Sequence, residues 1–110
     1  MMKTEESVLV EHFGRSPVIC VIDFLLDNRL YDYSKQQIAE GCGIGRVTLF
    51  NNWKKIEKLH LVKETRRFGK TKLYKLNEAN PVVKKIIELE LALAGQAAEK
   101  HIKAIRAVTA

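Results

Sequence analysis

Apolar residues along this chain recur mostly at helical spacing, and they alternate with polar residues in only one region. The first segment with helical spacing covers residues 4–13 and ends before Gly14. Ser16 and Pro17 are a capping residue and a proline at the first helical position, which predicts the start of a second helix. That helix is apolar on nearly every side as far as Leu26, so we expect it to be the central, most buried helix. The apolar stripe of the first segment is Val8, Leu9 and Phe13.

Two further helices are predicted between residues 34 and 60, with a glycine-bearing turn between them. Ser34 is followed three residues later by Gln37, the spacing of a capping box. The segment 41–43 (Gly-Cys-Gly) is predicted to end that helix in a tight turn, because glycine accepts a left-handed backbone. The next helix, from about Gly45 to His60, has a single apolar stripe. Its members are Leu49, Trp53, Ile56 and Leu59.

Strand-like alternation follows in residues 61–68 and 72–77, joined at 69–71 (Gly-Lys-Thr), which predicts a β-hairpin. Asn80 and Pro81 then signal another helix, and no residue forces a stop before about residue 108. Gly95 could kink or divide this helix, which would be ~40 Å long if unbroken. The expected packed side of the hairpin is Leu61, Val62, Leu73, Tyr74 and Leu76.

The order of these elements, helix, turn, helix and hairpin, is that of a winged helix-turn-helix. We therefore expect a mainly α chain with a small β-hairpin. Residues 1–79 would form the DNA-binding domain, including the N-terminal helix, and residues 80–110 a dimerisation helix.

Positive charge is concentrated in one part of the chain. The formal net charge is +6. Residues 46–75 contain ten Lys or Arg and two acids, so this segment carries +8 and the remaining residues together carry −2. A localised cationic segment is expected of a protein that docks on phosphates.

Residues 38–40, 44–49 and 56–62 resemble winged-helix transcriptional regulators, and residues 64–67 and 69–77 resemble their wing, in a style common among archaeal regulators. The resemblance implies a homodimeric repressor or activator of the broad group that includes the arsenic-repressor-like and multiple-antibiotic-resistance-like proteins. Two positions depart from the family pattern. His60 stands where the family usually has glycine, and Trp53 where it usually has a smaller aliphatic residue.

The outward face of the helix 45–60 is the predicted recognition surface, placed in the major groove. Arg46 can pair with guanine and Asn51 with adenine, whereas Val47 and Phe50 offer apolar surface to thymine methyl groups. An ordinary solvated helix face is the alternative interpretation. Thr48 could bind a phosphate or simply lie beside the turn. The side chains better placed to reach phosphates are Lys54, Lys55 and Lys58.

The predicted wing, residues 63–75, crowds four cations around one turn with no acid among them. These cations are Arg66, Arg67, Lys70 and Lys72. Such a turn can follow the DNA backbone or place an arginine in the minor groove. Charges that only keep a hairpin edge soluble are the alternative, but four cations exceed what edge protection needs.

Apolar residues of the final helix form a seam at steps of three and four, close to a heptad. The helix could pair two protomers, or it could fold back over its own domain. Small alanine side chains allow close approach and favour the dimer, with the N-terminal helix completing the interface. The predicted dimer seam is Ile87, Leu91, Ala94, Ala98, Ile102 and Ile105.

Other classes of function have little support in the sequence. There is no nucleophile elbow, phosphate loop or carboxylate cluster, so no enzyme is expected. The cysteines and histidines stand at no metal-ligand spacing, so neither a metal nor another cofactor is expected. Cys42 could be a redox-sensitive thiol or simply a small turn residue. No apolar run approaches the ~20 residues of a membrane span, and the polar N-terminus has no signal-peptide pattern, which predicts a cytoplasmic protein.

These patterns predict a sequence-specific regulator of transcription that binds double-stranded DNA as a homodimer, with half-sites about one helical turn apart. The alternative is a winged-helix interaction module of a larger assembly that binds DNA weakly or not at all. The charge of the wing argues against that alternative. The sequence leaves open whether an effector ligand acts.

Overall fold

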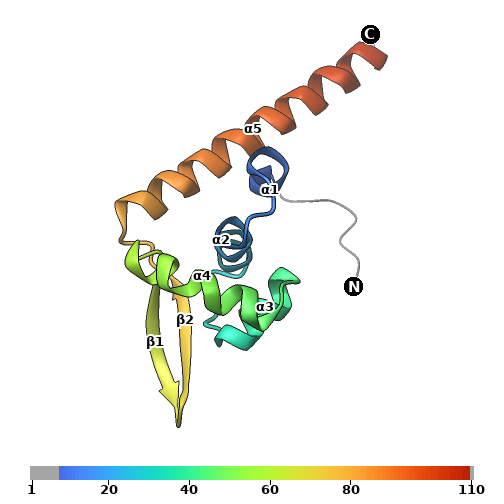
Figure 1. The fold of residues 1–110 in the computed structure, drawn as a ribbon. Helices are drawn as coiled ribbons and strands as arrows, with labels where there is room; N and C mark the ends of the chain where they lie inside the picture. Colours follow the sequence, from blue (N-terminus) through green and yellow to red (C-terminus); the bar gives the residue numbers. More distant parts are fainter. Residues whose placement is uncertain (1–7, 110) are drawn as a thin grey trace.

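The computed structural model describes residues 8–109, and within them five helices and one antiparallel hairpin follow one another (Figure 1). The elements are α1 (Val8–Phe13), α2 (Pro17–Asp27), α3 (Lys35–Cys42), α4 (Arg46–Lys58), β1 (Val62–Phe68), β2 (Thr71–Leu76) and α5 (Pro81–Thr109). A mainly helical winged helix-turn-helix with a long C-terminal helix is thus confirmed. Residues 4–7, which belong to the predicted first helix, lie outside the described residues.

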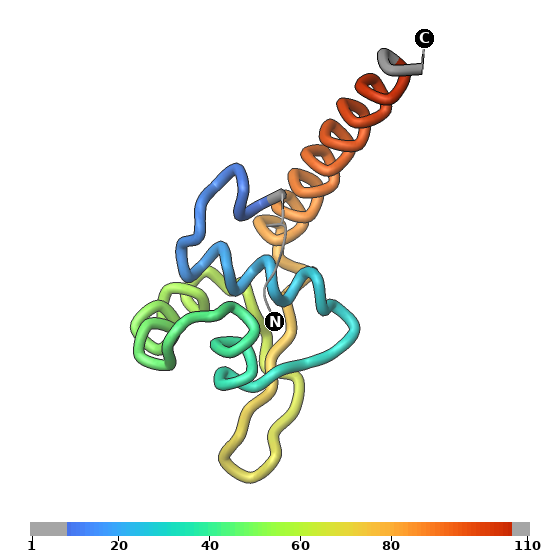
Figure 2. Tube along the Cα trace, turned by 90° about the vertical axis from the view of Figure 1, so that its right-hand side faces the viewer, coloured from blue at the N-terminus to red at the C-terminus, as the bar shows by residue number. Residues whose placement is uncertain are grey.

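Helix α2 lies at the centre, in contact with α1, α3, α4 and β2. Its side chains Val21 and Leu25 are buried together with Ile38 of α3 and Ile56 of α4. The prediction that α2 is the most buried helix is confirmed. Figures 1 and 2 show the hairpin and the far end of α5 projecting from this core in opposite directions, and the molecule measures 61 × 31 × 22 Å.

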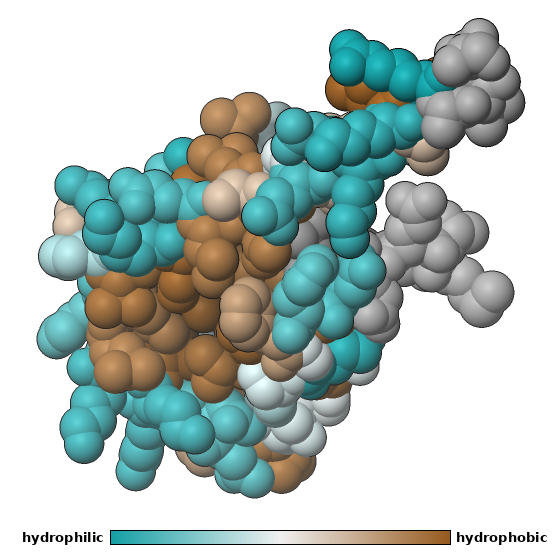
Figure 3. All heavy atoms as spheres, turned by 90° about the horizontal axis from the view of Figure 1, so that it is seen from above, coloured by the Kyte–Doolittle hydropathy of each residue, from teal (hydrophilic) through white to brown (hydrophobic). Residues whose placement is uncertain are grey.

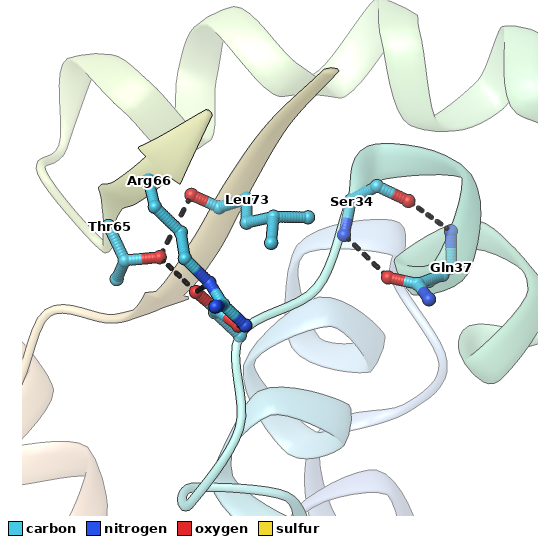
Figure 4. A network of polar contacts seen from close by, with 6 residues as sticks. Ser34, Gln37, Thr65, Arg66 and Leu73 are labelled. Carbon is cyan, nitrogen blue, oxygen red and sulfur yellow. Dashed lines mark hydrogen bonds and ion pairs between the residues drawn. The ribbon is translucent and has the colours of Figure 1, made fainter. Parts of the chain in front are cut away.

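The predicted caps are present at the starts of α2 and α3. Ser16 Oγ accepts from the backbone N–H of Ile19 at 3.2 Å. Ser34 Oγ accepts from the N–H of Gln37 at 3.2 Å, and Gln37 Oε1 accepts from the N–H of Ser34 at 2.9 Å (Figure 4). Each cap pairs backbone donors that a helix start leaves without an intrahelical partner.

The end of α3 differs from the prediction. The helix continues through Gly41 and ends at Cys42. Gly43 is its C-cap, and of residues 41–43 only this one has a left-handed backbone, with φ of 70°. Gly41 is needed for packing, since a Cβ there would lie 2.1 Å from Cε1 of Phe24. Cys42 is buried in the core as the last helical residue, so its interpretation as a turn residue is wrong.

The apolar stripe of α4 is confirmed for Leu49, Trp53 and Ile56, which are buried. It is wrong for Leu59, which is 51% exposed. The helix ends at Lys58, so Leu59 no longer follows the helical spacing that would turn it inward. His60 comes next with φ of 55°, a left-handed backbone that glycine adopts without strain.

In the hairpin, Val62 pairs with Leu76 and Phe68 with Thr71. The turn is shorter than predicted, because Thr71 already belongs to β2. Tyr33, in the connector between α2 and α3, exchanges two backbone hydrogen bonds with Tyr74, of 2.9 and 2.8 Å. This bridge attaches β2 to the domain. The predicted packed side is confirmed, with Leu61, Tyr74 and Leu76 buried and Val62 and Leu73 half-buried.

Helix α5 is continuous through Gly95. Its first turns belong to the core, where Val83 is fully buried and α1 packs beside the helix. Phe13 was expected on the apolar stripe of the first helix but is 51% exposed, since it is the last residue of α1.

The predicted dimer seam on α5 is only partly buried within one chain. Ile87 and Ala94 are half-buried, and the exposed members are Leu91, Ala98, Ile102 and Ile105. Figure 3, seen from the α5 side, shows a broad apolar area rimmed by polar side chains.

Candidate nucleic-acid interface

Helix α4 presents a face that no other described element covers. Gly45 caps its start, and Arg46 is its first residue. Val47 and Phe50 are 73% and 70% exposed, although both are large apolar side chains. The remaining predicted contact residues of this helix are also exposed: Arg46, Thr48, Asn51, Lys54 and Lys55. The predicted recognition residues are therefore accessible together on one helix.

A shallow cleft of about 140 Å³, which we name the α3–α4 cleft, lies beside this face. It is lined by Lys35, Gln36 and Ala39 of α3 and by Arg46, Leu49 and Phe50 of α4. Because Leu49 and Ala39 are buried, they form the floor, while Arg46 and Phe50 belong to the exposed rim. The first turns of both helices of the helix-turn-helix thus border one surface.

The wing cations do not all behave as predicted. Arg66 was expected among the cations at the tip, but it binds Asp32 in the connector before α3. Its Nε and Nη2 donate to the two carboxylate oxygens at 2.8 and 3.0 Å, and Thr65 Oγ1 donates to the same carboxylate at 2.5 Å (Figure 4). The pairing register shifts between Glu64 and Arg66, where the alternation of this strand changes.

This contact has a clear electrostatic signature. The hydrogen bond from Arg66, followed by that from Thr65, lowers the pKa of Asp32 from 3.8 to about 2. The same partner raises the pKa of Arg66. Asp32 is therefore ionised at neutral pH, and a bidentate charged pair ties the outer half of β1 to the connector before α3.

The other wing cations lie around one acid or at the turn. Glu64 forms ion pairs with Arg67 at 3.6 Å and with Lys72 at 3.8 Å, and all three side chains are at least 40% exposed. Pairs of this length at a surface are weak, so both cations can exchange Glu64 for another anion. Lys70 occupies the turn next to Gly69, where it is exposed.

A second cleft, of about 320 Å³, lies between the start of α3 and the wing, and we name it the α3–wing cleft. Its lining is Lys35, Gln36, Lys70, Thr71, Lys72 and Tyr74. Tyr74 is buried, and burial raises the pKa of its hydroxyl, which therefore stays protonated at neutral pH. The cleft brings two predicted wing residues, Lys70 and Lys72, next to the start of α3, on which the sequence predicts no DNA-contacting residue.

Three residues of this surface were missed from the sequence. Lys35 and Gln36 follow the N-cap Ser34 directly, so their position at the start of the first helix of the motif was a signal that could have found them. Asp32 offered no such signal, since its partner Arg66 lies 34 residues further along the chain.

Neither a metal centre nor a membrane span is present in the part of the chain that the structure describes. No three His, Cys, Asp or Glu side chains within residues 8–109 come together as metal ligands. None of the helices in this range has both the length and the apolar character needed to cross a membrane.

Comparison with solved structures finds proteins of the same fold. A variant of ZitR from Lactococcus lactis aligns over 86% of this chain and 74% of its own, with a TM-score of 0.62 and 20% identity. NadR, in complex with 4-hydroxyphenylacetate, aligns over 99% and 90%, with a TM-score of 0.57 and 16% identity. MepR, a transcription regulator of the Staphylococcus aureus multidrug efflux pump MepA, aligns over 92% and 78%, with a TM-score of 0.53 and 16% identity.

At these identities the likeness establishes the fold, a winged helix with a long C-terminal helix, and not the function. No protein-family model matches the chain, and the curated proteins include no significant match.

Proposed function

We propose that this chain is a transcriptional regulator that binds double-stranded DNA as a homodimer. Helix α4 enters the major groove, Arg46 and Asn51 read base edges, and the wing follows the backbone or the minor groove. The structural neighbours support this proposal, because MepR is a transcription regulator with the same fold. Sequence preference arises from α4, and most of the affinity arises from the cations.

One observation supports the proposal above all others: the exposed face of α4 and the cationic wing border the same surface. The two clefts share Lys35 and Gln36, so the surface continues from Arg46 across the start of α3 to Lys70. Every charged side chain that lines either cleft is cationic. A duplex seated on α4 would therefore meet positive charge at its flank.

The homodimer is supported by the far part of α5, which projects beyond the domain with apolar side chains exposed. Leu91, Ile102 and Ile105 are 63%, 47% and 50% exposed. Exposed apolar side chains repeated along one helix are a typical surface for pairing with a second helix. Two protomers joined there would present two α4 helices to one duplex.

The proposal is tested by selecting duplexes from a random pool with the full-length chain, then measuring affinity for the selected and for a random duplex. Arg46→Ala should lower affinity for the selected duplex by about 1–3 kcal/mol and leave random binding nearly unchanged. Lys70→Ala should weaken both by the same factor. Equal losses on both duplexes for both variants would remove α4 from the recognition role.

Docking of a protein partner on α4 is the second candidate, because Val47 and Phe50 are large apolar side chains at high exposure. A wild-type chain that enriches no duplex from the pool and retains none at low salt would favour this candidate. Retention of duplex that weakens steeply with salt would exclude it as the main role.

A further inference from the structure

The ammonium group of Lys35 is held in place by two aromatic rings. Its Nζ lies 5.1 Å from the ring centroid of Trp53 and 6.0 Å from that of Tyr74. The two rings pack edge to face at 4.9 Å and are themselves buried, at 2% and 4% exposure. A lysine over fixed aromatic faces is attracted to them and loses less freedom on binding than a lysine in open solvent.

Lys35 also has a distinct position among the cations. It is the one cationic residue common to both clefts, with Arg46 bordering one side and Lys70 and Lys72 the other. Gln36, Thr71 and Tyr74 also line the α3–wing cleft. The amide of Gln36 donates to Glu40 Oε1 at 3.4 Å and has a second N–H for an anion, and the hydroxyl of Thr71 can donate as well. The α3–wing cleft thus combines a pre-positioned charge, two further ammonium groups and neutral donors.

The geometry favours a phosphate of a nucleic-acid backbone over other anions. The cleft is open to solvent and adjoins the exposed face of α4, so a rod-like ligand that contacts Arg46 continues past Lys35. An enclosed site for a small free anion would instead surround its ligand. Lysine binds phosphate as a point charge and needs no fixed fork of donors, which suits a backbone that passes along an open cleft.

We propose that the α3–wing cleft is a seat for one backbone phosphate of the bound duplex, with Lys35 as its principal ligand and Trp53 and Tyr74 as the residues that position it. This inference rests on the proposed function, since the phosphate belongs to the duplex read by α4. It assigns to α3, and not only to α4 and the wing, a direct contact with DNA.

The test is a thermodynamic cycle between one lysine and one phosphate. The probe is the duplex that the wild-type chain selects from a random pool, scanned with single neutral methylphosphonate linkages along each strand. At one linkage, neutralisation should weaken the wild-type chain about tenfold and Lys35→Gln hardly at all. The slope of log affinity against log salt should become shallower by about one for Lys35→Gln.

Lys84→Gln is the matched control, because Lys84 is an exposed lysine of α5 that lines neither cleft. It should keep the wild-type response to every methylphosphonate. Lys35→Arg keeps the charge over the rings, so the methylphosphonate should still weaken its binding nearly as much as that of the wild-type chain. This variant separates loss of the phosphate ligand from loss of folding.

The outcomes distinguish the two proposals. If Lys35→Gln and Lys84→Gln respond alike at all linkages, the phosphate seat is overturned while DNA binding stands. If the wild-type chain selects no duplex, the proposed function fails, and the phosphate seat fails with it.

Discussion

The side-chain amide of Asn80 donates a hydrogen bond of 2.8 Å to the backbone carbonyl of His60. The same amide donates to the carbonyl of Leu59 at 2.9 Å, and its oxygen accepts from the N–H of Val82 at 2.8 Å. One residue thus binds the carbonyls at the end of α4 and caps the start of α5. Asn77 adds a bond of 3.0 Å to the same His60 carbonyl. Helices α4 and α5 are therefore linked by hydrogen bonds and not only by the chain between them.

Asn80→Ala should lower the free energy of unfolding by about 1–3 kcal/mol, since it removes a cap and two bonds to carbonyl groups. Asn80→Ser is the matched variant. It keeps an oxygen for the cap but loses the amide donor, so it should fall between wild type and Asn80→Ala. Urea denaturation followed by circular dichroism measures both. If Asn80→Ser were as stable as the wild type, the hydrogen bonds from Asn80 to α4 would contribute nothing to the free energy of unfolding.

His60 holds a left-handed backbone that costs an L-residue roughly 1–2 kcal/mol, and glycine avoids this cost. His60→Gly should therefore raise the free energy of unfolding by about 1 kcal/mol. His60→Ala retains the Cβ and should give no such gain. Thermal or urea unfolding of the three proteins checks this, and a destabilised glycine variant would contradict it.

Asp32→Asn should make stability less dependent on acid pH. The pKa of Asp32 is lowered in the folded state to about 2 from 3.8, so its contribution is present above the ordinary value and is lost as pH falls towards about 2. The stability difference between wild type and Asp32→Asn should therefore be largest at neutral pH and shrink between those two pH values. Urea denaturation at a series of pH values measures it, and a constant difference down to the lowest pH would refute the linkage.

Two Gly→Ala substitutions should change the free energy of unfolding in opposite directions. Alanine at 41 would place its Cβ against the Phe24 ring, so overpacking should lower the free energy of unfolding by about 1–3 kcal/mol. Alanine at 95 meets no atom within 4 Å and replaces glycine within a continuous helix, which should increase stability by up to ~1 kcal/mol. Measuring the unfolding midpoint of each variant against that of the wild type checks both predictions. A harmless Gly41→Ala would show that Phe24 moves aside without cost.

Ile102→Glu should shift the chain from dimer towards monomer, because it places a charge on the exposed apolar seam of α5. Gln96→Glu adds the same charge to an exposed position of the same helix outside the seam and should leave the assembly unchanged. Sedimentation velocity over a range of concentrations measures both. A dimer that survives Ile102→Glu would place the interface elsewhere.

The sequence predicted the helices well where the signals are local. Ser16, Ser34 and Asn80 each mark a helix start, because a cap depends on residues within one helical turn. The end of α3 was predicted less well. The sequence pattern assigns Gly41 to the turn, but glycine is required there by the close approach of Phe24, a residue of another helix. A close approach between elements leaves no local pattern.

For the candidate interface too, local features could be predicted from the sequence and long-range contacts could not. The exposure of α4 followed from a stripe at helical spacing, and the charge of the wing could be counted directly. By itself the sequence determined the elements, their order and which part of the chain is cationic, because these depend on neighbours within a few residues. Only the tertiary structure decided that Arg66 turns back to Asp32 and that Lys35 lies over Trp53 and Tyr74. Those contacts join residues far apart in the chain, and they form only once α3 with its preceding connector, α4 and the hairpin have packed against one another.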